Sequence, residues 1–158
     1  MEINIMQLIS ASRSGDLEAL QTLIAQGADL NAKDEKGYTP LIIACYNNQI
    51  ASAELLLNAG ANVNASDFGG NTALMGVCFK GYPNIAKLLL EHGADPDLQQ
   101  GNGGTALMFA AMFGRNDLLK ILLEHGADKT ILDSRGMSVF DLAAQQGNEE
   151  AIGILEAA

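Results

Sequence analysis

The sequence predicts an all-α solenoid, a stack of five short repeats in which each repeat holds two helices and a turn. Three observations predict this fold class: motifs recur every 33 residues along the 158-residue chain, each copy places a capping residue ahead of an apolar stripe, and a glycine or asparagine follows each stripe. We expect a single domain with repeats at about 1–33, 34–66, 67–99, 100–132 and 133–158.

Several columns of identical or similar residues keep the same register without an insertion. A Gly-Ala pair followed by Asp or Asn recurs from Gly27, and a Thr-x-Leu motif recurs from Thr39, with Ser138 opening a divergent last copy. Chance does not hold so many columns in phase over a whole chain. The glycine columns stand at 37, 70, 103 and 136, and at 15, 81, 114 and 147, where the second repeat has Asn48.

The first helix of a repeat is best seen in the second copy. Thr39 is a good N-cap, and Pro40 at the next position loses no hydrogen bond because the first N–H groups of a helix have no partner. Leu41, Ala44 and Cys45 follow at the i, i+3, i+4 spacing of a buried helical stripe.

The second helix and the turn complete the repeat. Asn48 suits the left-handed residue that ends the first helix, a second helix then carries Ala53 and Leu55 to Leu57, and Gly60 stops it. The polar segment that leads to the next repeat is predicted to be a turn, closed by aspartates such as Asp34, Asp67 and Asp133.

With these motifs the chain resembles the ankyrin repeat family, whose Thr-Pro-Leu-His-x-Ala pattern and 33-residue period match Thr39-Pro40-Leu41-Ile42-Ile43-Ala44 and its copies. The resemblance covers essentially the whole chain and implies an ankyrin-repeat solenoid with β-hairpin-like turns along one edge. The motif's histidine is absent from every copy, and the motif's proline is kept only in the second repeat, at Pro40. The histidine position holds Ile42, Met75, Met108 and Asp141.

The terminal repeats differ from the inner ones, as expected of units with one neighbour. The first has Ser10, Ser12 and Thr22 where the inner copies are larger or more apolar, and the last has Glu156 in a column of Ile and Leu. We therefore interpret both as capping repeats and expect the protein to be a monomer on its own.

Charge and composition limit the partners. Nine Lys and Arg against nineteen Asp and Glu give a formal charge of −10, which repels nucleic acid and favours a basic or neutral protein surface. Apolar runs are too short to cross a membrane, and no leader is visible at the N-terminus. Two cysteines in such a chain indicate reduced thiols, so we expect an intracellular and cytoplasmic protein.

No catalytic, cofactor or metal site is predicted. His92 and His125 share a column at the end of the second helix, where an imidazole complements the helix C-terminus, and they lack further ligands. Cys45 and Cys78 share a core column too far apart for a relaxed disulfide. The glycine-rich stretch 99–104 lacks the Lys-Ser/Thr ending of a phosphate loop and is expected to be a mobile turn.

The aromatic residues predict the site. Phe109 and Phe140 are expected in the core, whereas Tyr46, Phe79 and Met112 form one column late on the first helix, with Phe113 next to it. In the family that the chain resembles, this column faces a concave groove that binds partners, and exposed aromatics are enriched at interface hot spots. Residues predicted at the upper rim are Tyr38, Phe68, Asn71, Lys80, Asn102, Arg135 and Met137.

The sequence thus favours a non-enzymatic module that binds a partner protein through the groove and the turn tips. Two alternatives stay open. One is a structural subunit of a larger assembly, which would depend on its partner for solubility. The other is a small-molecule or enzymatic role, which would need a deep pocket with converging polar groups.

Overall fold

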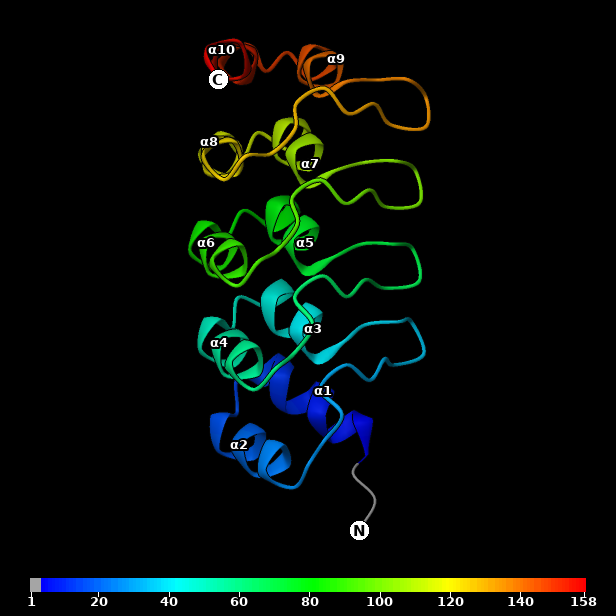
Figure 1. Ribbon diagram of the computed structural model, residues 1–158, viewed down its shortest axis with the longest axis vertical. Helices are drawn as coiled ribbons and strands as arrows, with labels where there is room; N and C mark the ends of the chain where they lie inside the picture. The colour runs from blue at the N-terminus through cyan, green and yellow to red at the C-terminus, as the bar shows by residue number, and fades with distance from the viewer. Residues whose placement is uncertain (1–3) are drawn as a thin grey trace.

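The computed structural model describes residues 4–158; residues 1–3, which begin the segment searched above for a leader, lie outside the described residues. The predicted all-α ankyrin-repeat solenoid is confirmed: the described chain forms ten helices in two parallel columns (Figure 1). The helices are α1 (Ile5–Ser14), α2 (Leu17–Ala25), α3 (Pro40–Tyr46), α4 (Ile50–Asn58), α5 (Ala73–Lys80), α6 (Pro83–Glu91), α7 (Ala106–Met112), α8 (Asn116–Glu124), α9 (Val139–Gln145) and α10 (Glu149–Ala157).

The odd-numbered helices form an inner column and the even-numbered helices an outer column, and each helix packs on the next member of its own column (Figure 1). The segments between pairs project beyond the inner column and are called fingers here. The first to fourth fingers are residues 26–39, 59–72, 92–105 and 125–138.

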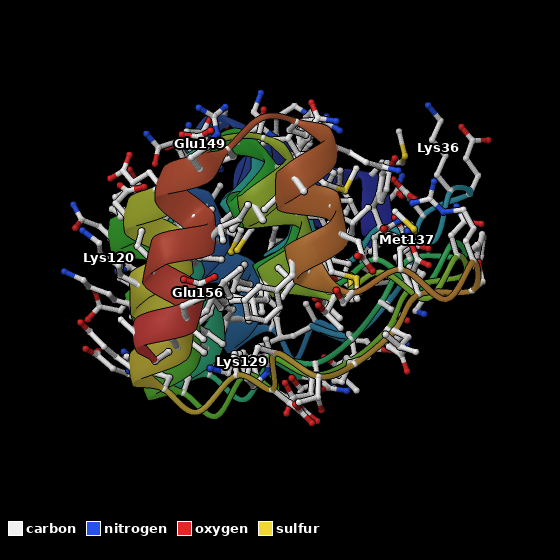
Figure 2. The ribbon with its side chains drawn as sticks, turned by 90° about the horizontal axis from the view of Figure 1, so that it is seen from above. Lys36, Lys120, Lys129, Met137, Glu149 and Glu156 are labelled. Atoms are coloured by element: carbon white, nitrogen blue, oxygen red, sulfur yellow. The ribbon has the colours of Figure 1, made fainter. Side chains whose placement is uncertain are left out.

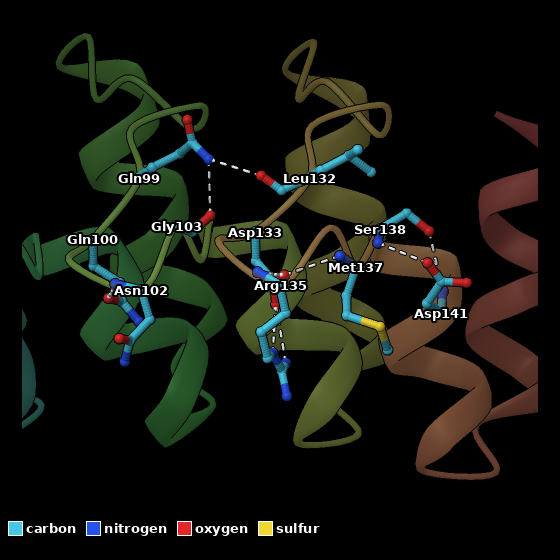
Figure 3. Close-up of polar contacts among 10 residues, drawn as sticks. All are labelled: Gln99, Gln100, Asn102, Gly103, Leu132, Asp133, Arg135, Met137, Ser138 and Asp141. Atoms are coloured by element: carbon cyan, nitrogen blue, oxygen red, sulfur yellow. Dashed lines mark hydrogen bonds and ion pairs between the residues drawn. The ribbon is translucent and has the colours of Figure 1, made fainter.

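The inner helices begin as the sequence predicts. The side-chain oxygens of Thr39, Thr72 and Thr105 accept hydrogen bonds from the backbone N–H three residues later, at 3.2 to 3.4 Å. Ser138 does the same with Asp141, whose carboxylate accepts from the Ser138 N–H in return, so the divergent fourth copy has a full capping box (Figure 3).

The inner helices also end as predicted, with a residue in the left-handed region. Asn48 has φ of 56°, and Gly81, its equivalent in the next repeat, has φ of 85°. Gly37 lies in the first finger, where close packing also requires a glycine. A Cβ at this position would lie 2.6 Å from the backbone nitrogen of Phe68 in the second finger.

The two cysteines are buried free thiols, as predicted. Burial raises the pKa of the Cys45 thiol to about 12. It also raises the pKa of Cys78, to which the nearby Asp117 carboxylate adds. Neither thiol is nucleophilic near neutral pH.

One part of the capping prediction is wrong. Ser12 occupies the same column as Cys45 and is fully buried, and its hydroxyl donates to the carbonyl of Leu8 at 2.7 Å. A buried hydroxyl satisfied within its own helix fits the core, so Ser12 does not mark an exposed end face. Ser10, Thr22 and Glu156 are exposed.

Hydrogen bonds tie successive fingers to one another. The side-chain oxygen of Asn31 accepts from the backbone N–H of Asn62, Asn64 does the same for Asp95, and Asp97 for Asp128, each at 2.8 Å. This ladder fixes the spacing of neighbouring repeats before any partner binds.

The glycine-rich segment of the third finger is bonded to both neighbours, which argues against a free turn. The Gly101 N–H donates to the Gly69 carbonyl at 2.8 Å, and the Ser134 N–H donates to the Asn102 carbonyl at 3.0 Å. The Gln99 side-chain amide bridges the carbonyls of Gly103 and Leu132 at 2.9 and 3.0 Å (Figure 3).

Candidate partner-binding groove

The first two fingers and the inner helices enclose a pocket of about 430 Å³, called the first pocket here. Its walls are mainly aromatic and aliphatic, with a few polar groups from the second finger. The sequence predicts a shallow aromatic groove, and this pocket is the part of it between the first two fingers. It is lined by Tyr38, Ile42, Ile43, Tyr46, Asn47, Asp67, Asn71, Thr72, Ala73, Met75, Gly76, Phe79 and Phe109.

A row of rings runs along the inner helices at the mouth of this pocket. The centroids of Tyr46 and Phe79 are 6.3 Å apart, and Phe79 meets Phe113 edge-to-face at 4.8 Å. The three side chains nevertheless keep 37%, 39% and 42% of their surface exposed. The rings therefore pack on each other and still present an apolar surface to solvent.

Phe109 is not a core residue, contrary to the sequence prediction. Its ring stacks on that of Phe113 with centroids 6.4 Å apart, and it lines the first pocket. Gly76, its equivalent one repeat earlier, lines the same pocket. Phe140 is likewise half-buried, since the described chain places no repeat beyond its own.

A second pocket of about 400 Å³ lies on the other side of Phe109. Met112, predicted as an anchor, is half-buried in its wall, and the exposed Asn102 and Arg135 belong to its rim. Arg135 donates through Nη2 to the Asp133 carboxylate at 2.9 Å (Figure 3).

The remaining predicted residues differ in how much of their side chain is exposed. Phe68 is 72% exposed on the second finger, with the Lys33 ammonium 5.9 Å from its ring centroid. Lys80 is exposed, and its ammonium lies 4.9 Å from the Tyr46 centroid. Tyr38, Asn71 and Met137 are half-buried, and Tyr38 and Asn71 also line the first pocket.

Two contributors were missed by sequence reasoning. Gly76 shares a column with Ile43, Phe109 and Leu142, and a Cβ at Gly76 would meet nothing within 4 Å. A comparison of the four residues in this column would have shown that only Gly76 lacks a side chain. Asp67 was interpreted only as a turn residue, yet it lines the first pocket.

Arg115 positions the middle ring of the row. Its guanidinium donates to the backbone carbonyl of Phe79 through Nε at 3.3 Å and Nη2 at 3.2 Å. These bonds join α8 to the end of α5, where the chain leaves the helix. The aromatic row is thus held by the next repeat.

The two histidines contact backbone carbonyls of their own helices. Nδ1 of His92 lies 3.0 Å from the Leu88 carbonyl, and Nδ1 of His125 lies 2.8 Å from the Ile121 carbonyl, as expected of helix C-terminal imidazoles. Across residues 4–158, no three His, Cys, Asp or Glu side chains gather as a metal-binding group. Within the same residues, no helix has both the length and the apolar character needed to cross a membrane.

Viewed along the stack, charged side chains such as Lys120 and Glu149 project from the outer helices, while Lys36 and Met137 mark the finger side (Figure 2). Stacked helix pairs with a groove between fingers and inner helices define an α-solenoid repeat protein.

The chain belongs to the ankyrin repeat family. The family description for ankyrin repeats in three copies matches residues 8–100 and 92–157. Repeats of this family generally mediate protein–protein interaction. A stretch of 38 residues is 50% identical to protein phosphatase 1 regulatory subunit 27 of Homo sapiens and of Mus musculus; it covers 24% of this chain and 25% of either relative.

Proposed function

We propose that the chain is a non-enzymatic module that binds a partner protein through the first pocket, the aromatic row and the finger tips. The observation that carries the proposal is the row itself, because Phe79 pairs with both Tyr46 and Phe113 and each of the three remains more than a third exposed. A partner that covers these rings removes a continuous apolar surface from water.

The ladder of bonds between repeats supports the same proposal. Because Asn31, Asn64 and Asp97 fix neighbouring repeats, the groove loses little conformational freedom on binding. The formal charge of −10 favours a basic or neutral partner surface. The matched human and mouse proteins are named as a regulatory subunit of a phosphatase, and this is in keeping with a binding role.

A cytoplasmic setting belongs to the proposal as well. It is supported by the two cysteines, which are buried free thiols that need no oxidising compartment.

The test is partner capture from a cell extract by the immobilised chain, quantified by mass spectrometry. Replacing Tyr46, Phe79 and Phe113 together by Ala is expected to abolish capture while circular dichroism and cooperative melting persist. Leu17 and Ile50, which are 38% and 42% exposed on the outer helices, provide a control pair. Equal capture by the triple variant and by the control pair would refute the groove as the binding site.

A further inference from the structure

We propose that the first pocket receives an arginine side chain of the partner. This inference rests on the proposed function, since it names the chemistry of a residue that the groove binds. It comes from comparing equivalent positions in the second and fourth fingers, which are two repeats apart in sequence.

The two fingers hold a carboxylate in the same way. Oδ1 of Asp67 accepts from the backbone N–H groups of Gly69 and Asn71, each at 2.9 Å. Oδ1 of Asp133 accepts from the backbone N–H groups of Arg135 and Met137, also at 2.9 Å. Because these backbone bonds match, the second oxygen of each carboxylate is presented in an equivalent direction.

The two fingers differ in what that second oxygen meets. Oδ2 of Asp133 accepts from the guanidinium of Arg135, through Nη2 at 2.9 Å and Nε at 3.3 Å (Figure 3). At the equivalent position the second finger has Gly69. Among the described residues, Oδ2 of Asp67 contacts only the neutral amide of Asn71, at 3.3 Å, and has no cationic partner. The fourth finger thus contains the guanidinium contact that the second finger lacks.

The space next to Asp67 suits the same group. The missing side chain at Gly76 opens the pocket, and the rings of Tyr38, Tyr46 and Phe79 line it. A guanidinium is planar, stacks on aromatic faces and donates to carboxylates with several N–H groups. An aliphatic side chain would cover the rings but would leave the Asp67 carboxylate desolvated without a cation. The combination of rings and one unneutralised carboxylate therefore selects arginine over leucine.

The Lys80 side chain places one positive charge at the mouth of the first pocket. Its ammonium lies 4.9 Å from the Tyr46 centroid, so the ring face of the row accepts a positive charge. Lys80 is exposed and does not contact Asp67 as an ion pair. It opposes an incoming guanidinium by like-charge repulsion, and Lys80→Gln is expected to tighten arginine binding.

The probe is a blocked pentapeptide with arginine at its centre and glycine elsewhere, titrated into isotope-labelled protein and followed by NMR. The matched peptides carry citrulline, which has the same shape without the charge, or leucine. The arginine peptide is expected to bind about tenfold more tightly than either, because citrulline keeps N–H donors but lacks the positive charge that strengthens a hydrogen bond to a carboxylate. The shifted amides are expected to include those of Asn71, Gly76 and Phe79.

Two variants locate the site. Asp67→Asn is expected to weaken arginine binding about tenfold, whereas Asp34→Asn, which removes the equivalent charge from the first finger outside the pocket, is expected to leave it unchanged. Gly76→Ile is expected to fill the pocket and to abolish binding. Unchanged helicity and a cooperative melting transition confirm that each variant is folded.

Three results would overturn the inference: equal affinity for the arginine and citrulline peptides, stronger binding of the leucine peptide, or equal effects of Asp67→Asn and Asp34→Asn. Absence of arginine binding to the unaltered chain overturns it too. If any of these occurs while the triple aromatic variant still loses its partner, the arginine pocket is wrong and the binding function stands.

Discussion

Replacing Gly76 by Ala is expected to stabilise the protein. Gly76 is the fourth residue of α5, in the helix interior, and a Cβ at this position would meet nothing within 4 Å. A glycine in a helix interior is less favourable than alanine by about 0.8–1.0 kcal/mol, and no clash offsets that gain. We expect the free energy of unfolding to rise by about 1 kcal/mol and the melting temperature to rise by about 2–4 °C.

Urea and thermal unfolding followed by circular dichroism measure this change. Gly153→Ala is the matched control, because Gly153 is an exposed interior residue of α10 that also has open space at its Cβ. Both variants are expected to stabilise the chain, and only Gly76→Ala is expected to weaken partner capture. A decrease in unfolding free energy for Gly76→Ala would show that the space is not free and would refute the reasoning.

Three further predictions concern stability. Ser52 is buried with a hydroxyl that has no partner among the described residues, so Ser52→Ala is expected to raise the unfolding free energy by about 1 kcal/mol in urea melts. Because burial raises the pKa of Cys45 to about 12 and also raises that of Cys78, the native chain keeps protons that the unfolded chain releases; unfolding free energy should fall between pH 9 and 11, and pH-independent stability there would contradict this. Arg115→Met removes two bonds to the Phe79 carbonyl and should lower stability by roughly 1 kcal/mol and broaden the Phe79 ring signals in NMR spectra; sharp, unshifted signals would argue against a positioning role.

Features that depend on local sequence were predictable. The caps at Thr39, Thr72 and Thr105 and the left-handed residue at Asn48 follow from the chemistry of a few neighbouring residues. The burial of Cys45 follows from its helical stripe together with the 33-residue register. All of these need only one repeat, or copies of one repeat, to be recognised.

Features that depend on a difference between repeats were not predicted. Phe109 was expected in the core, but its ring is half-buried and lines both pockets. Ser12 was assigned to an end face by its polarity, although its hydroxyl is satisfied by Leu8 within the helix. The position of the Phe109 ring depends on neighbours from other repeats. The Ser12 bond is local, and it was missed because a polar residue was taken to mark an exposed face.

The proposed role of Asp67 also depends on a difference between repeats. From the sequence alone it is one of three equivalent turn aspartates, and only the hydrogen bonds distinguish it from Asp133, which has Arg135 as a partner. The value of a repeat protein for such comparisons is that each finger serves as a control for the others.

Hydrogen–deuterium exchange of the chain with its captured partner, read by mass spectrometry, tests the binding site most directly. The account predicts slower exchange on binding in residues 34–47, 67–81 and 109–113, which hold the finger and inner-helix segments of the groove, with little change in α4, α6 and α8. Protection confined to those outer helices would contradict it.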